Sequence, residues 1–250
     1  MLKVCKFGGS SVAGAEQFRK VRDIVLSDDS RRVVVISAAG KRTSDDHKLT
    51  DLLYLCHAHL TYGVSCADIL AAIRSRFVSI RDELGLSYRV EDEFDAYAAT
   101  LSRDTSVDEL VSRGEYFTAR LMAETLGYAF VDAADCVFFG FDGQFDRART
   151  DAAIADALEK NGKIVLPGFY GRVPTGKIKV MTRGGSDITG ALAAAAVNAD
   201  VYENWTDVSG ILMADPRIVE NPRPIPRITY AELREMAFMG ASVLHEESIL

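Results

Sequence analysis

The sequence lacks the features that mark several large classes of protein. Its 250 residues contain no run of about 18 uninterrupted apolar residues, so a membrane-spanning helix is not expected. The N-terminus has no long apolar segment ending in a small-residue cleavage site, which argues against secretion. Basic residues are outnumbered, with 29 Lys and Arg against 36 Asp and Glu. The resulting net charge of −7 argues against a nucleic-acid partner.

Cysteine is also scarce. The four cysteines are scattered without a CxxC pair, a pattern typical of free thiols in a reducing compartment. Cys56, His57 and His59 lie close together, but their segment LLYLCHAHL is helical in pattern and no second ligand pair follows at zinc spacing. We therefore expect a cytoplasmic protein with no metal site built from its own side chains.

Short apolar runs alternate with segments of helical periodicity along the chain. Strands are expected at residues 4–7, 31–37, 128–133, 163–169 and 200–205. Helices are expected after residue 11, from near Thr50, through most of 66–127, and over 186–199 and 229–239, with a hairpin around Thr175 and Gly176. This alternation predicts an α/β fold, a three-layer αβα sandwich around a mainly parallel central sheet.

Residues 6–11 read KFGGSS and join the first expected strand to a helix. Glycine lets backbone N–H groups approach a phosphate, and a helix N-terminus adds partial positive charge. Lys6, at the end of the strand, can reach the same anion. The segment matches neither common glycine-rich nucleotide motif. By itself it fits a plain strand–turn–helix connection as well as a phosphate site.

A second Gly-Gly loop, TRGGSD, occupies residues 182–187 and also precedes a helix. Arg183 offers a guanidinium fork suited to a carboxylate or a phosphate. Asp187 falls in the first helical turn, where a carboxylate can simply cap the helix. Capping does not account for the Arg-Gly-Gly sequence, so a binding role is the stronger hypothesis for this loop.

The segment SRGEY, residues 112–116, places a glycine inside an expected helix. That helix begins at the capping box Ser106–Glu109 and ends near Gly127. A glycine in a helix interior costs about 1 kcal/mol relative to alanine. This cost indicates close packing or the approach of a ligand beside Glu115, although simple tolerance is equally compatible with the sequence.

Polar, glycine-containing loops follow three of the expected strands. They lie around residues 8–11, 168–171 and 206–210. Loops at the carboxyl ends of parallel strands are where α/β sheets bind ligands. The last of them belongs to WTDVSGILMADPR (205–217), which alone is no more than a well-formed turn.

Taken in order, KFGGSS, SAAG followed by LTDLL, SRGE, GFYG, TRGGSD, WTDV and DPR resemble the segments of aspartate kinases, over essentially all 250 residues. The resemblance implies the amino acid kinase fold and one catalytic domain over residues 1–250. It implies transfer of the γ-phosphoryl group of ATP, carried with Mg²⁺, to the β-carboxylate of L-aspartate, giving 4-phospho-L-aspartate. This is the first step of the aspartate-family pathway to lysine, threonine and methionine. A homodimer is also implied.

The chemistry of that reaction fits the residues present. An aspartate carboxylate is already ionised at neutral pH and needs no general base, so positioning and positive charge should dominate catalysis. The resemblance implies that Lys6 neutralises charge on the transferring phosphoryl group and that Asp187 orients Lys6 and the reacting groups. The residues implied to line the phosphate path or contact the nucleotide are Gly8, Gly9, Ser10, Thr206, Asp207 and Arg217.

The resemblance also implies the contacts of the amino acid. Arg183 would hold a carboxylate of the substrate, and Glu115 would pair with its ammonium group. Thr50 and Ser186 would add hydrogen bonds, and Phe169 would shape the aspartate pocket.

The sequence departs from the family pattern in two motifs and at its C-terminal end. Leu212 replaces a tyrosine associated with the nucleotide, and Ser242 stands where a nucleotide-contacting lysine is common. The family usually continues beyond the position of Leu250 with the end of the catalytic domain and ACT-type regulatory domains. We therefore expect this chain to lack both, either as a fragment of a longer protein or as a short form that depends on a partner.

Two other functions stay open at this point. One is a kinase for another small acid such as glutamate, against which SRGE and LTDLL argue. The other is a catalytically silent ligand-binding module, which Ser242 and the abrupt ending suggest.

Overall fold

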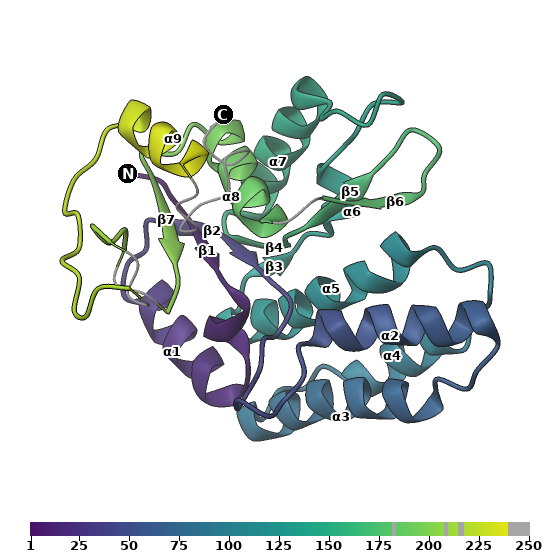
Figure 1. The fold of residues 1–250 in the computed structure, drawn as a ribbon. Helices are drawn as coiled ribbons and strands as arrows, with labels where there is room; N and C mark the ends of the chain where they lie inside the picture. The colour runs from purple at the N-terminus through teal and green to yellow at the C-terminus, as the bar shows by residue number, and fades with distance from the viewer. Residues whose placement is uncertain (182–183, 208–209, 215–217, 240–250) are drawn as a thin grey trace.

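The structure is a computed structural model that describes residues 1–181, 184–207, 210–214 and 218–239. Within these residues, five parallel strands form a central sheet in the order β3-β4-β2-β1-β7 (Figure 1). The strands are β1 (Lys3–Phe7), β2 (Arg31–Ile36), β3 (Ala129–Phe130), β4 (Ile164–Pro167) and β7 (Val201–Trp205). All four pairings between them are parallel, which confirms the predicted sheet.

A second, two-stranded sheet follows β4. It is an antiparallel hairpin of β5 (Tyr170–Arg172) and β6 (Ile178–Val180). The backbone N–H of Gly176 donates to the carbonyl of Val173 at 2.9 Å and closes the turn. The hairpin predicted around Gly176 is therefore confirmed.

Helices cover both faces of the central sheet (Figure 1). One face carries α1 (Ala15–Leu26), α2 (Leu49–Tyr62), α3 (Ala67–Leu84), α4 (Val90–Ala98) and α5 (Val107–Leu126), with the short 3₁₀ helix η1 (Gly9–Val12) at its edge. The other carries α6 (Ala133–Cys136), α7 (Arg147–Asn161) and α8 (Gly185–Ala196). A further helix, α9 (Tyr230–Phe238), follows β7. The predicted αβα sandwich is confirmed.

Strand β2 shows why both faces must be covered. Val34 and Ile36 pack into the core on the α1–α5 side, and Val33 and Val35 pack into the core on the α6–α8 side. All four side chains are fully buried. Continuous β-branched runs of this kind are typical of parallel strands between two helical layers.

The long helix α5 brings the SRGEY segment to the sheet. The Ser106 hydroxyl caps the helix by accepting from the backbone N–H of Glu109 at 3.2 Å, and Gly127 ends it in the left-handed conformation, as predicted. A Cβ atom at Gly114 would lie 3.0 Å from the Cβ of Ala38. Close packing against the loop after β2 therefore accounts for the glycine.

Strand β3 is shorter than the sequence predicts. An extended segment was expected over 128–133, but the paired strand is Ala129–Phe130. The carboxylate of Asp132 accepts from the backbone N–H of Ala134 at 2.9 Å and starts α6. This cap turns the chain away from the sheet and ends the strand.

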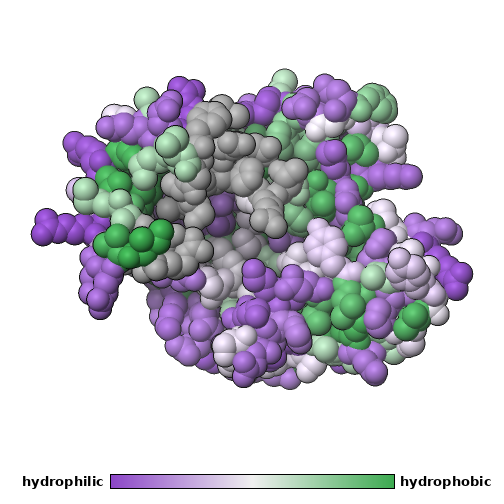
Figure 2. Space-filling view, in the orientation of Figure 1, coloured by the Kyte–Doolittle hydropathy of each residue, from purple (hydrophilic) through white to green (hydrophobic). Residues whose placement is uncertain are grey.

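None of the helices in the described part of the chain is both long and apolar enough to cross a bilayer. Figure 2 shows a face dominated by hydrophilic side chains, with apolar ones in separated clusters. Exposed apolar residues on α2 include Leu55 and Tyr62.

Candidate active site

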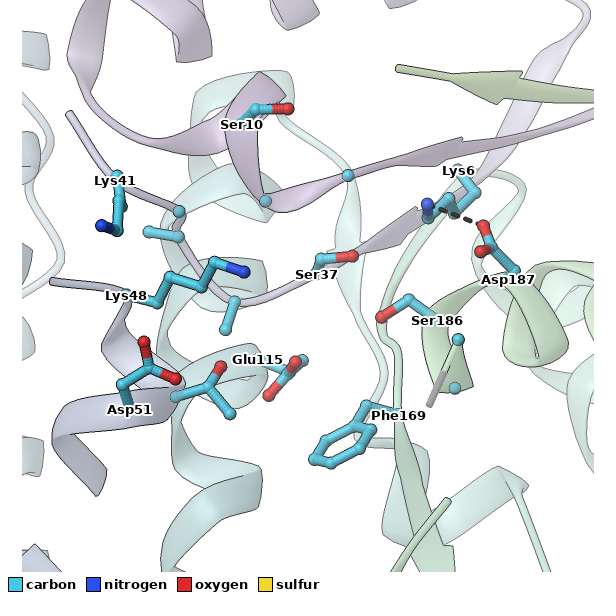
Figure 3. Close-up of a pocket in the computed structure, with 18 of the residues that line it drawn as sticks. Lys6, Ser10, Ser37, Lys41, Lys48, Asp51, Glu115, Phe169, Ser186 and Asp187 are labelled. Carbon is cyan, nitrogen blue, oxygen red and sulfur yellow. Dashed lines mark ion pairs between the residues drawn. The ribbon is translucent and has the colours of Figure 1, made fainter. Parts of the chain in front are cut away.

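A cavity of about 1070 Å³ opens at the carboxyl edge of the central sheet. Its walls come from the segments that follow β1, β2, β4 and β7 and from the N-terminal turns of α2 and α8 (Figure 3). The segments meet because the strands are parallel, so their carboxyl ends share one edge. The site thus lies where the polar loops of the sequence predicted a ligand.

The Gly-Gly loop after β1 lies directly against the loop after β2. The backbone N–H of Gly40 donates to the carbonyl of Gly9 at 2.8 Å, and that of Ser37 donates to Phe7 at 3.2 Å. A Cβ atom at Gly40 would lie 2.7 Å from the carbonyl carbon and oxygen of Gly9. Both glycines are therefore required for the two loops to touch.

Replacing Gly40 with alanine is expected to force these loops apart. The clash is with backbone atoms, which cannot rotate away, so we expect a loss of stability of about 1–3 kcal/mol together with impaired nucleotide binding. Urea denaturation and nucleotide titration would measure the two effects. Gly14→Ala is the matched control, since its Cβ would meet the Gln17 side chain at an ordinary 3.4 Å. Equal behaviour of the two variants would contradict the prediction.

Lys6, the last residue but one of β1, forms an ion pair with Asp187 in the first turn of α8. Lys6 Nζ lies 2.7 Å from Asp187 Oδ1, and the two side chains are 10% and 16% exposed. Figure 3 shows the pair at one end of the cavity. Segments 181 positions apart in sequence are thus joined by one short, largely desolvated contact. The catalytic role of Asp187 stays a prediction.

Strand β7 holds Asp187 from the other side. Asn204 donates to the same carboxylate oxygen at 3.1 Å, and the Tyr202 hydroxyl donates to the backbone carbonyl of Asp187 at 3.3 Å. These contacts orient the carboxylate toward Lys6, and the N-cap position of α8 is Gly184, which has no side chain to cap the helix.

Glu115 is a buried carboxyl group in the wall of the cavity. The residue is 5% exposed, and its Oε2 atom has no hydrogen-bond partner among the described residues. Burial raises the pKa of Glu115 to about 8, although a hydrogen bond from the backbone of Ala38 lowers it in part. A buried carboxyl oxygen without a partner is costly, and a positively charged ligand group in the cavity would satisfy it.

Phe169 has an uncommon backbone conformation at the edge of the cavity. Its φ is 77°, in the left-handed region that bulky residues rarely adopt. The Thr189 hydroxyl accepts from its N–H at 3.1 Å, and its carbonyl accepts from Met181 at 2.7 Å. The strain places the ring against the cavity (Figure 3), and strain of this kind clusters at functional sites.

The structure brings most of the other predicted residues to the same cavity. Besides those above, its lining includes Gly8, Ser10, Thr50, Ser186 and Asp207. Thr206 does not line it; the Thr206 hydroxyl donates to Asp207 at 3.1 Å.

Three residues discussed from the sequence lie outside the described residues. They are Arg183, Arg217 and Ser242. Leu212 is described: its backbone forms an isolated bridge with Pro224, away from the cavity lining.

No role was assigned from the sequence to several residues that line the cavity, two of which (Ser37 and Asp51) fall in the SAAG and LTDLL segments. They include Ser37, Lys41, Lys48, Asp51, Tyr54 and Met181. Most belong to the segment between β2 and the first turns of α2, which the sequence presented as a polar loop and a helix start. A signal was present, because two lysines occur in a loop that follows a buried strand.

The arrangement has a distinct electrostatic layout. A lysine stands at the end of the cavity that two glycine-containing turns, η1 and the start of α8, also line, and helix N-termini favour anions. A buried carboxyl group lies in another part of the wall. The cavity can thus accommodate phosphate at one place and an ammonium group at another.

Comparison with known proteins identifies the family. A model described as the amino acid kinase family matches residues 1–250. Aspartokinase 3 of Bacillus subtilis is 35% identical over 263 residues, and lysine-sensitive aspartokinase 3 of Escherichia coli is 36% identical over 273. These alignments cover 100% and 99% of this chain, and 58% of each relative. The chain therefore spans less than two thirds of the length of these relatives.

Solved structures show the same similarity. An aspartate kinase of Clostridium acetobutylicum has a TM-score of 0.91 at 45% identity, covering 99% of this chain and 56% of its own. E. coli aspartokinase III, solved in complex with aspartate and ADP, has a TM-score of 0.84 at 32% identity, covering 100% of this chain and 59% of its own. With a family model matched from end to end, the chain belongs to the amino acid kinase family.

Proposed function

We propose that this chain is the catalytic domain of an aspartate kinase, which transfers the γ-phosphoryl group of ATP to the β-carboxylate of L-aspartate. The observation that carries the proposal is the buried Glu115 carboxyl group, which faces the same cavity as the Lys6–Asp187 pair. The Glu115 carboxyl group suits the ammonium of an amino acid, and Lys6 suits the phosphates of a nucleotide. The similar E. coli enzyme was solved with aspartate and ADP, which supports this pair of substrates.

The residues would act mainly by charge and position. Aspartate arrives with its carboxylates ionised, so the barrier is the meeting of two anions rather than the removal of a proton. Lys6 would stabilise the negative charge on the transferring phosphoryl group. Asp187 and Asn204 would keep the ammonium of Lys6 in place, and the backbone N–H groups around Gly9 would bind the phosphates.

The amino acid would lie beside α5. Glu115 would accept the substrate ammonium, and this charge would favour the ionised form of Glu115 on binding. Thr50 and Ser186 would donate hydrogen bonds, and the ring of Phe169 would close one side of the pocket. Arg183, outside the described residues, stays a predicted carboxylate ligand.

Magnesium would enter with the nucleotide. The described residues contain no cluster of three or more His, Cys, Asp or Glu able to hold a metal ion. Asp207 lines the cavity, and Mg²⁺ typically binds through one or two carboxylates plus substrate phosphates. The residues present thus fit an ion that the nucleotide carries, whose contribution is to neutralise phosphate charge.

An ADP-release assay with different amino acids tests the proposal. Purified protein with Mg-ATP is expected to turn over with L-aspartate and far less with L-glutamate, and hydroxylamine should trap the acyl phosphate. Turnover with another acid but not with aspartate would favour the alternative kinase. Binding of aspartate without any trapped product would favour the silent ligand-binding module.

The homodimer, the cytoplasmic location and the absence of a nucleic-acid partner stay predictions. So does the place of the reaction as the first step toward lysine, threonine and methionine.

A further inference from the structure

The loop between β2 and α2 is closed by a buried arginine of α3. Arg76 is 4% exposed, and its guanidinium donates to the backbone carbonyl of Gly40 and, at 2.6 Å, to that of His47. It also lies 3.6 Å from Asp46. The two ends of the loop are therefore tied to the same side chain.

The loop is braced internally as well. The Asp46 carboxylate accepts from the backbone N–H of Arg42 at 3.0 Å and from Arg42 Nε at 2.8 Å. Hydrogen bonds from Arg42, the first cause, and the charge of Arg76 hold the pKa of Asp46 well below its usual range. Asp46 is therefore ionised at neutral pH, and the brace is intact there.

Arg76 holds the carbonyls of Gly40 and His47, and we call this contact the Arg76 clamp. The next residue, Lys48, precedes the first turn of α2. Figure 3 shows its side chain extending from the loop into the cavity. Among the residues drawn, the figure marks an ion pair between Lys6 and Asp187 and none at Lys48. Lys48 thus presents a positive charge to the cavity without an anionic partner among those residues.

The charge of the acceptor amino acid explains why such a lysine would be useful. Aspartate carries two carboxylates and one ammonium group at neutral pH. Glu115 suits the ammonium, and Lys6 is already paired with Asp187 on the phosphate side. Lys48 and Thr50 both line the cavity and lie two positions apart, so an amino acid bound by Thr50, as proposed above, would bring its carboxylates to the part of the wall that carries Lys48.

We propose that Lys48 binds a carboxylate of the acceptor amino acid, and that Arg76 is the positioning residue that holds Lys48 in place through the loop. The inference rests on the proposed function. Neither residue was assigned from the sequence motifs, because neither lies in the segments that carry the resemblance.

The test is the affinity for L-aspartate, measured by calorimetry without nucleotide. Lys48→Met is expected to raise the dissociation constant for aspartate about 10- to 100-fold, the usual range for losing one charged hydrogen bond. Lys48→Arg is expected to retain most of the affinity, and the dissociation constant for ADP should not change. Lys160→Met on α7 is the matched control for charge removal, because Lys160 is exposed and does not line the cavity.

Each other outcome has a defined meaning. An unchanged dissociation constant for aspartate in Lys48→Met overturns the proposal, and so does weaker ADP binding with aspartate unaffected. If the wild-type protein binds aspartate but forms no acyl phosphate, the proposed function fails, while the calorimetric comparison still decides the role of Lys48. A wild-type protein that binds no aspartate overturns both.

A double-mutant cycle tests the positioning role of Arg76. Arg76→Lys keeps the charge but cannot span both carbonyls, so we expect weaker aspartate binding in the wild-type background. In the Lys48→Met background the same change should have little further effect, because Arg76 acts through Lys48. Equal effects in both backgrounds would mean that Arg76 has a structural role alone.

Discussion

Replacing Lys6 with methionine is expected to lower kcat with aspartate and Mg-ATP about 10³-fold. Lys6 is a largely buried cation at the carboxyl edge of the sheet, and the reaction that we propose accumulates negative charge on the transferring phosphoryl group. Methionine keeps most of the aliphatic length, so packing changes little while the charge disappears. Steady-state kinetics should show the loss mainly in kcat, since the interaction strengthens in the transition state.

Two further variants distinguish a loss of activity caused by the missing charge from one caused by reduced stability. Lys6→Met leaves the Asp187 carboxylate without its cationic partner and should also destabilise the protein. The double variant Lys6→Met/Asp187→Asn should recover stability but not activity. Lys3→Met is the matched control, because Lys3 lies on the same strand and pairs with Asp28 at 2.9 Å, away from the cavity. Full activity of Lys6→Met would exclude the proposed role.

Replacing Glu115 with glutamine is expected to raise the KM for aspartate about 100-fold, in line with the loss of one partner of a buried charged pair. Glutamine keeps the size of the side chain but cannot take the negative charge that the substrate ammonium needs. Initial-rate kinetics over a range of aspartate concentrations measure the effect. An unchanged KM would show that the ammonium binds elsewhere.

The same substitution is expected to stabilise the protein at alkaline pH. The pKa of Glu115 is about 8 in the folded chain, above the ordinary 4.5. Between these values the folded state keeps a proton that the unfolded state releases. The wild-type free energy of unfolding therefore falls as pH rises, by at most about 1.4 kcal/mol per pH unit for one proton. Glu115→Gln lacks this dependence, so its advantage in urea denaturation should grow from pH 5 to pH 8.

Glu93 supplies a control, because its pKa is shifted downward while that of Glu115 is shifted upward. Burial alone would raise its pKa, but hydrogen bonds from Tyr116 and Tyr88 and the charge of Arg120 give a net lowering. Its contribution to stability is present above the unfolded pKa and is lost in acid. Glu93→Gln should therefore destabilise the protein at pH 7 and leave the KM for aspartate unchanged. A Glu115→Gln variant that behaved like Glu93→Gln would contradict the assigned burial.

The fold could be predicted because its strands and helix caps have local causes. The valine run of β2 and the Ser106 cap of α5 need no knowledge of the rest of the chain. Helix α7 was not predicted, although Asp146 caps it and Ile154 and Leu158 recur at helical spacing. Its charged and small residues, with few apolar positions, give a weak periodicity that is easily overlooked.

Residues of the site that lie in sequence motifs could be predicted. Features that depend on tertiary contacts could not. The Lys6–Asp187 pair was implied by the resemblance to aspartate kinases, which the two glycine loops help to carry. The positive φ of Phe169 could not be foreseen, since it depends on partners in α8 and on the hairpin side. The clamp of Arg76 on Gly40 and His47 depends on how α3 packs, which no local pattern encodes.

The order of the sheet has a consequence for synthesis on the ribosome. Strand β1 is the first strand of the sheet to be made, yet one of its two neighbours, β7, begins at Val201, 198 positions after the Lys3 with which it pairs. The backbone groups on one edge of β1 therefore stay unpaired until β7 has been made. Pairing between strands so far apart in sequence is slow. Asp187 is made 14 positions before β7 begins, but its carboxylate accepts from Asn204 of β7, so its contact with Lys6 is fully braced only after β7 has joined the sheet.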